Sequence, residues 1–208
     1  MLDDMKLYAD LGLTGLNYEG NSVMQTADLT AMRAWVCAQL SWDAGRDSLA
    51  LVNEFLVNYY SAGAAGYILE HMHAYTDEID RQNYYVTPAD AATAGYFTPA
   101  VIYSSLSALN KAIVNATAAS EARPRSKVVK AIKGLRVSPW FLALSNWAAL
   151  CAHTTAHSLP WPLAETSRHA SLASFASNVT ALLGANLLAT EAGALAAMNA
   201  SKDLTCGK

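Results

Sequence analysis

Apolar residues return every three or four positions along most of the chain, a spacing typical of helices that bury one face. The first such stretch runs to about Trp42, and Asp28 or Thr26 is suited to cap its start. A second helix is predicted to begin after Asp47, another capping residue, and a third covers residues 65–79. The first third of the chain is therefore expected to be a series of short, packed helices.

The second half continues this pattern. Thr98-Pro99 is a strong helix start, because threonine caps well and proline is favoured in the first turn. Pro124 opens a stretch whose apolar positions continue to Leu150, and Pro139 is expected to bend it. An alanine-rich helix, or a pair of helices, is predicted over about residues 164–200.

The first 26 residues have a different pattern. Met5–Gly12 forms a short amphipathic turn or helix, and an extended stretch closed by Gly20 and Asn21 follows it. A lone strand cannot satisfy its own backbone hydrogen bonds, so its partners are expected to lie outside this sequence. We predict a mainly α fold, a helical bundle or array preceded by one short orphan β-strand. Residues 1–26 form one unit and residues 27–208 a helical domain, with an irregular loop at about 80–97.

Composition narrows the range of partners. The chain is 53% hydrophobic and 15% charged, with a formal net charge of -3. There is no basic excess to attract nucleic acid, and the basic cluster from Arg123 to Arg136 is interpreted as the solvated face of a helix. So low a fraction of charged residues indicates that much of the chain's surface is covered by other protein and not by water. The cover is expected from the fold itself, a second copy in a homo-oligomer, or a missing part of the same polypeptide.

Two apolar stretches, 137–152 and 179–198, approach the length of a membrane span. Both contain polar residues and are interpreted as buried helices, so no membrane contact is predicted; a membrane-associated alternative rests on the second stretch. The start of the chain lacks the apolar run of a signal peptide.

Three cysteines, Cys37, Cys151 and Cys206, are odd in number and far apart, which excludes a disulfide framework. One pair is still able to bridge in an oxidising compartment. Glycosylation sequons begin at Asn115, Asn178 and Asn199, and they weakly favour a secreted or extracellular location.

A series of motifs carries a family resemblance. In chain order these are Gly12-Leu13-Thr14-Gly15, Tyr18-Glu19-Gly20, Arg33-Ala34-Trp35, Leu40-Ser41-Trp42-Asp43, Asn53-Glu54-Phe55 and Tyr59-Tyr60-Ser61-Ala62-Gly63-Ala64-Ala65. The series resembles the C-terminal part of an uncharacterised glycoside-hydrolase-like family, distantly similar to α-glucuronidases and hexosaminidase-type barrels. The match is clear from about Tyr8 to Tyr75 and weaker to about Trp147.

The resemblance implies that a (β/α)8 barrel precedes the helices and that Thr14–Glu19 is its last strand. Tyr18, Glu19 and Asn21 would then lie at the rim of a sugar-binding cleft, because such clefts form at the C-terminal ends of barrel strands. The catalytic acid pair would come from an earlier strand. The chain alone is therefore expected to be inactive, with carbohydrate as the partner of the intact parent protein.

Other candidate chemistry is sparse. His153 and His157 are four residues apart and share a helix face, as zinc ligands do, but no acid follows at ligand spacing. We therefore predict no metal site and no cofactor. His71 is interpreted as a side chain without a site role, and Ser105 has no accompanying His–Asp pair. Glu54 is interpreted as a salt-bridge or capping group.

Only some of the aromatic residues are predicted to contact sugar. Trp35, Trp42, Tyr59 and Tyr60 lie on helical stripes and are predicted to be core residues, whereas Tyr84 and Tyr85 in the irregular loop are better contact candidates. The sequence thus favours a helical portion of a carbohydrate-active, glycoside-hydrolase-like protein. The alternatives are a free-standing helical interaction or oligomerisation domain and, more remotely, a metal-dependent enzyme centred on the two histidines.

Overall fold

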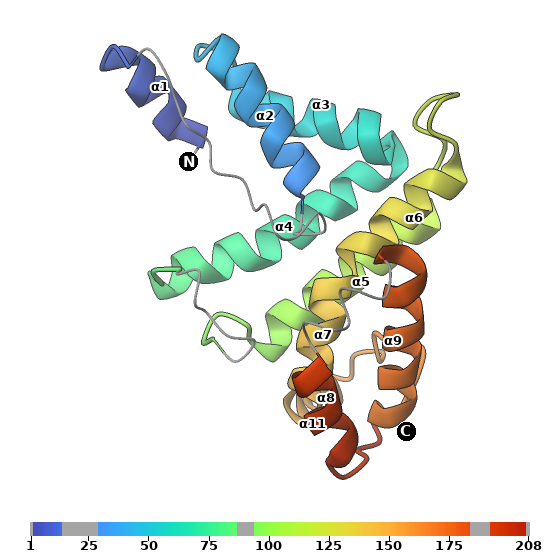
Figure 1. The fold of residues 1–208 in the computed structure, drawn as a ribbon. Helices are drawn as coiled ribbons and strands as arrows, with labels where there is room; N and C mark the ends of the chain where they lie inside the picture. Colours follow the sequence, from blue (N-terminus) through green and yellow to red (C-terminus); the bar gives the residue numbers. More distant parts are fainter. Residues whose placement is uncertain (1, 14–28, 87–93, 184–191, 207–208) are drawn as a thin grey trace.

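The structure is a computed structural model that describes residues 2–13, 29–86, 94–183 and 192–206, and these are almost entirely helical (Figure 1). The helices are α1 Leu2–Asp10, α2 Thr30–Trp42, α3 Ser48–Tyr60, α4 Ala62–Gln82, α5 Pro99–Asn115, α6 Arg125–Leu135, α7 Val137–Ser145, α8 Trp147–Ala156, α9 Arg168–Leu183 and α11 Ala192–Ala200. The predicted mainly α fold is confirmed.

The predicted orphan strand falls almost wholly on residues outside the described ranges. Within those ranges the extended pairing consists of two isolated bridges, Ser120 with Arg123 and Ser167 with Thr205. The barrel and the division at residue 26 therefore stay predictions.

Several helices begin at the capping residues that the sequence predicts. The Asp47 carboxylate accepts hydrogen bonds from the backbone N–H groups of Leu49 and Ala50 at the start of α3. Thr98 Oγ1 accepts from Val101 N–H, and Pro99 occupies the first turn of α5. At the start of α2, Leu29 has a left-handed backbone and no side-chain cap; the predicted caps Thr26 and Asp28 lie outside the described residues.

The single helix predicted from Pro124 to about Leu150 is wrong. The chain forms three helices there, with changes of direction at Arg136 and Asn146. Pro139 lies in the first turn of α7, where a missing N–H is tolerated, so it helps to start a helix and does not bend one. In the alanine-rich region, the described residues, 164–183 and 192–200, contain α9 and α11.

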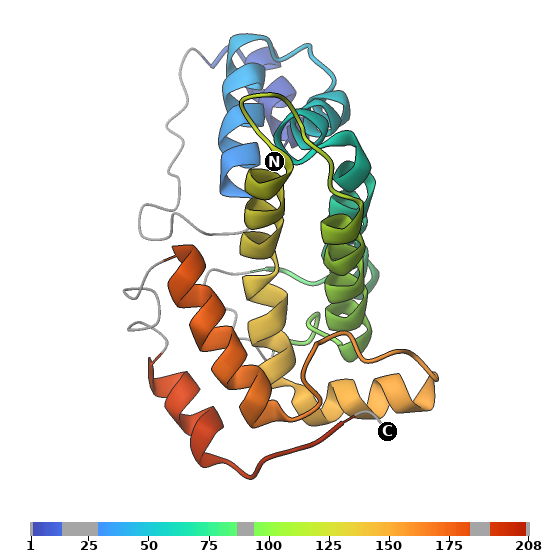
Figure 2. The ribbon, with the colours of Figure 1, turned by 90° about the vertical axis from the view of Figure 1, so that its right-hand side faces the viewer.

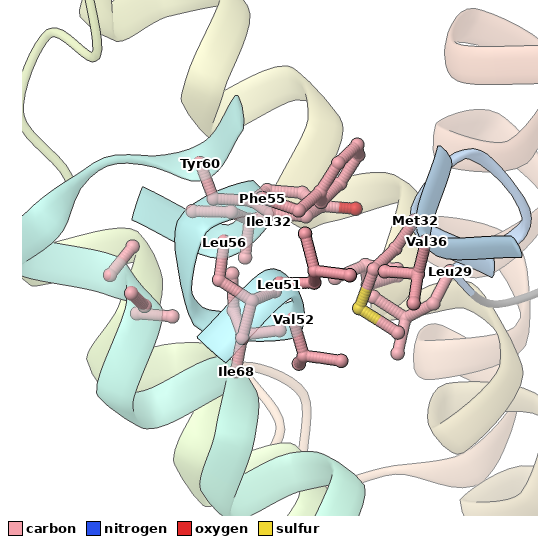
Figure 3. Packing of buried hydrophobic residues seen from close by; sticks show 14 of the residues in the cluster. Leu29, Met32, Val36, Leu51, Val52, Phe55, Leu56, Tyr60, Ile68 and Ile132 are labelled. Atoms are coloured by element: carbon pink, nitrogen blue, oxygen red, sulfur yellow. The ribbon is translucent and has the colours of Figure 1, made fainter. Parts of the chain in front are cut away.

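The helices enclose two hydrophobic cores. The first lies among α2, α3, α4 and α6, where side chains such as Val36, Leu56 and Ile132 interlock (Figure 3). The second lies among α5, α7, α8 and α9, around Trp140 and Trp147. The long contact between α4 and α5 links the two cores, and α8 lies across one end of α5 (Figure 2).

Candidate functional site

The residues predicted to contact sugar, Tyr18, Glu19 and Asn21, lie outside the described residues. Another feature of the same resemblance is described: the Leu40-Ser41-Trp42-Asp43 motif, which spans the end of α2 and the start of the turn to α3. We define the α2–α3 turn as residues 42–49.

Hydrogen bonds hold the α2–α3 turn in one conformation. Asp43 Oδ1 accepts from Gly45 N–H at 2.9 Å, and Asp47 caps α3. The Arg46 guanidinium donates to Gln39 Oε1 and forms an ion pair with Glu54 at 3.5 Å. The salt-bridge interpretation of Glu54 is thus confirmed. A turn tied at both ends can hold its side chains in fixed positions.

Trp42 is 93% exposed, so the prediction that it is a core residue is wrong. It is the last residue of α2, where the apolar stripe of the helix no longer faces a neighbour. Trp35 is half-buried against Phe55, with ring centroids 5.8 Å apart, and Tyr60 is buried as predicted. Tyr85, one of the two predicted contact residues, is 86% exposed.

A shallow depression of about 490 Å³ lies at the α2–α3 turn and is lined by Lys6 of α1, Leu40 of α2 and residues 44–49 of the turn. Its polar groups include an ammonium, a guanidinium and a carboxylate, and the exposed Trp42 precedes the first lining residue of the turn by two positions in the chain. Such a surface can hydrogen-bond hydroxyl groups and stack on the C–H face of a sugar ring. It offers no nucleophile and base in mutual contact.

The sequence interpretation missed a buried polar cluster between α4 and α5. His71 Nδ1 lies 2.8 Å from Ser105 Oγ, and the Tyr75 hydroxyl donates to the same oxygen at 3.2 Å. Burial lowers the pKa of His71 to about 4. His71 and Ser105 are 2% and 0% exposed, so substrate cannot reach this Ser–His pair and its role is to join two helices. The helical spacing of Ile68, His71 and Tyr75 was the signal for an inward-facing histidine.

His153 of α8 and His157, the C-cap residue of that helix, do lie on one side, as predicted. The rings of His153 and His157 have centroids 4.4 Å apart, and Tyr103 lies 6.2 Å from the first. Burial, together with the neighbouring His157 charge, lowers the pKa of His153. In the described part of the chain, no group of three or more His, Cys, Asp or Glu side chains is placed to share a metal ion.

The basic cluster is only partly the solvated face that we predicted. Lys127, Lys130 and Lys133 are exposed, but two arginines turn inward. Arg123 lies over the Tyr59 ring at 3.3 Å, and Arg136 lies over the Trp140 ring at 5.0 Å. Burial lowers the pKa of Arg136, and the negative charge of Glu165 offsets part of this shift by raising it. The i, i+4 spacing of Arg136 and Trp140 was a readable sign of this contact.

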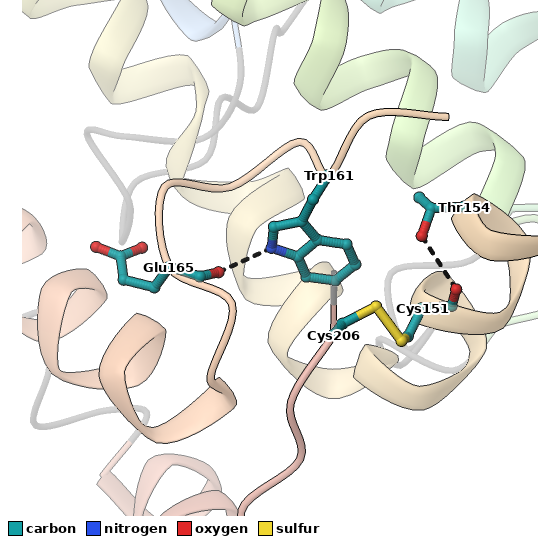
Figure 4. Close-up of a disulfide and its surroundings, with 5 residues drawn as sticks. All are labelled: Cys151, Thr154, Trp161, Glu165 and Cys206. Carbon is teal, nitrogen blue, oxygen red and sulfur yellow. Dashed lines mark hydrogen bonds between the residues drawn. A yellow bond between two sulfur atoms is a disulfide. The ribbon is translucent and has the colours of Figure 1, made fainter. Parts of the chain in front are cut away.

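A disulfide joins Cys151 of α8 to Cys206 near the C-terminus (Figure 4). It is one of the three cysteine pairs that the sequence allowed. Cys37 is a buried free thiol. The segment before Cys206 runs beside the start of α9: Cys206 N–H donates to Thr166 O, and Arg168 N–H to Leu204 O. The Asp203 carboxylate accepts from His169 N–H and from Ser167, which lowers its pKa.

Residues 1–73 match a family described as a domain of unknown function (DUF4838), a region that contains α1, α2, α3 and the start of α4. No curated protein and no solved structure matches the chain. The α2–α3 turn lies inside the matched region, so Trp42 and its neighbours belong to the part of the chain shared with that family. Among the described helices, none combines the length and apolar character needed to cross a membrane.

Proposed function

We propose that this chain is the helical portion of a glycoside-hydrolase-like, carbohydrate-active protein and that it contributes a sugar-contacting surface at the α2–α3 turn. The observation that carries the proposal is the 93% exposed indole of Trp42 in the same α2–α3 turn whose residues 44–49 line a polar depression. A large aromatic side chain left almost entirely in water is free to pack on a partner, and tryptophan contributes both an apolar face and an N–H donor to such contacts. Sugar rings suit such a partner surface, because they combine apolar C–H faces with hydroxyl edges.

The charged groups around Trp42 support this choice of ligand. Arg46 and Asp47 already have internal partners that fix their positions, and both keep atoms near the depression. Fixed polar groups beside an aromatic ring give orientation as well as contact area. The resemblance of the surrounding motifs to glycoside-hydrolase-like proteins points to the same ligand class.

Catalysis is assigned to the rest of the parent protein. A glycosidase acid needs a raised pKa and a second carboxyl group about 5–9.5 Å away. Among the described carboxyl groups, Glu78 has its pKa lowered to about 2 by hydrogen bonds from Arg81 and Gln82, and the pKa of Asp203 is also lowered. These shifts run opposite to the requirement for a general acid.

The test is oligosaccharide binding by isothermal titration calorimetry, with cello-, xylo- and chito-oligosaccharides as probes. We expect binding to at least one series and a loss of about tenfold or more in affinity for Trp42→Ala, since aromatic anchors contribute on the order of 2 kcal/mol. Val114→Ala is the matched control, because Val114 is 75% exposed on α5 and does not line the depression. Equal affinities for wild type and Trp42→Ala, or no binding in any series, would refute the proposal.

A second candidate is a free-standing interaction or oligomerisation domain. Leu7 in α1 and Leu11 and Leu13 just after α1 are 53%, 69% and 54% exposed. The helices α1 and α2 end on the same side of the molecule (Figure 1). Together with Trp42 these leucines are able to form an apolar contact with another protein. Light scattering during dilution separates the two candidates: a dimer that Leu11→Asp dissociates would favour the interaction domain.

A further inference from the structure

The outer face of α6 carries a row of lysines. Lys127, Lys130 and Lys133 are all exposed, whereas Val128 and Ile132 on the opposite face are buried in the first core. The helix lies on the side of the molecule that faces the viewer in Figure 2. Residues three positions apart on a helix have Cβ atoms about 5–6 Å apart, so the three side chains leave α6 along one line. We call these three residues the lysine row.

The surrounding sequence concentrates positive charge at this helix. Residues 123–136 contain six of the chain's 14 lysines and arginines, and no aspartate or glutamate. The rest of the chain holds the other eight lysines and arginines and all 17 acidic residues, so its net charge is -9. An otherwise acidic chain therefore has one strongly basic segment.

Internal contacts do not account for the lysine row. Within the described part of the chain, no carboxylate lies within 4.0 Å of any of its three ammonium groups. Two arginines of the same segment are used internally instead, since Arg123 lies over Tyr59 and Arg136 over Trp140. Like charges one turn apart weaken a helix, and Lys127 also lies in the first turn of α6, where the macrodipole opposes a positive charge. Stability of the helix is therefore not the reason for these charges.

We propose that the lysine row binds a carboxylated polysaccharide with one carboxylate on each sugar residue. The inference rests on the proposed carbohydrate-active function and adds the charge of the ligand that a second surface takes. The interval of about 5–6 Å between positions in the row is comparable to the length of one sugar residue, so successive carboxylates meet successive lysines. An ammonium group is a point charge with rotatable donors, which suits carboxylates whose orientation varies along a flexible chain.

Other anionic partners fit the lysine row less well. A DNA duplex carries about one charge per 1.7 Å of its axis, and the net negative charge outside this segment repels so dense a polyanion. Arginine suits phosphate geometry better than lysine does, and the exposed row consists of lysines. A basic helix binds a membrane surface by inserting its apolar face, but the apolar face of α6 is already buried in the first core.

The experiment measures the fluorescence anisotropy of end-labelled oligogalacturonate mixed with the full chain. Methyl-esterified oligogalacturonate keeps the sugars and loses the charges, so it is the matched probe, and a DNA duplex is the second comparison. We expect saturable binding of oligogalacturonate that weakens about fivefold or more as sodium chloride rises from about 50 to about 300 mM, because salt screens exposed charges. The methyl ester should not bind.

The variant that tests the surface combines Lys127→Gln, Lys130→Gln and Lys133→Gln. It should bind oligogalacturonate about tenfold or more weakly, because three charge contacts are lost. The control changes the net charge by the same amount through three exposed cations outside the row: Arg33→Gln, Lys111→Gln and Lys202→Gln. The control should bind as the wild type does. Thermal unfolding checks that both variants are folded.

Four results would overturn the proposal. Oligogalacturonate does not bind, or its methyl ester binds equally well, which would show that the charge is not recognised. Both triple variants lose the same affinity, which would assign the effect to net charge and not to the row. The DNA duplex binds more tightly at the same salt concentration, which would make α6 a nucleic-acid surface.

This test is separate from the test of the α2–α3 turn. Trp42→Ala should leave the affinity for oligogalacturonate unchanged, and the triple lysine variant should leave the affinity for neutral oligosaccharides unchanged. Failure of one proposal is therefore distinguishable from failure of the other.

Discussion

Gly63, near the start of α4, is predicted to be intolerant of even one added methyl group. A Cβ built at this position would overlap the backbone carbonyl oxygen of Asn115 at the end of α5. A backbone carbonyl in a helix cannot rotate away as a flexible side chain would. Gly63→Ala must therefore push α4 and α5 apart along the contact that links the two cores.

The magnitude follows from two opposing effects. Alanine in a helix gains roughly 0.5–1 kcal/mol over glycine, whereas overpacking costs typically about 1–3 kcal/mol. Gly66, three residues on in α4, has nothing within 4 Å of a Cβ. Gly66→Ala should thus gain the propensity alone and stabilise the protein. The difference in unfolding free energy between the two variants isolates the overlap at about 1–3 kcal/mol.

Urea unfolding at constant m-value measures this difference directly. We expect the midpoint to fall for Gly63→Ala and to rise for Gly66→Ala. Equal stabilisation by both substitutions would show that α4 does not approach the end of α5 so closely, and would refute the packing described here.

Three further predictions concern stability. The pKa of His71 is about 6.5 in the unfolded chain and about 4 in the folded protein, so the unfolded state binds more protons between these two pH values. The free energy of unfolding should therefore fall by about 3 kcal/mol as the pH drops through that window. His71→Gln should flatten this part of the curve of urea midpoint against pH, and an unchanged slope would contradict the burial of His71. Reduction of the Cys151–Cys206 disulfide, which spans 55 residues, should cost about 4 kcal/mol by the chain-entropy estimate; thermal melts with and without reductant, compared with Cys206→Ser, check this, and identical melts would argue against the bridge. Asp47→Ala should lower the free energy of unfolding by about 1 kcal/mol, because α3 loses its cap. Asp77→Ala, on the exposed side of α4, should change it little. Similar urea midpoints for both variants would contradict the capping role of Asp47.

Local sequence signals determined much of the fold. Helical periodicity predicts the mainly α architecture, and Asp47 and Thr98-Pro99 mark the starts of α3 and α5 as the structure has them. These signals act within a few residues, because a cap or a proline affects only its own turn. They fail where two helices follow with no linker, as at Arg136, since apolar spacing continues across the change of direction.

Contacts between distant segments were decided only in the tertiary structure. Periodicity assigned Trp42 to a buried stripe, but exposure depends on whether another element covers the end of α2. The hydrogen bond between His71 and Ser105 and the disulfide between Cys151 and Cys206 join residues 34 and 55 positions apart. Residue type and spacing give the chemistry that a side chain offers. Only the packing of helices decides which side chains meet and which are left in water.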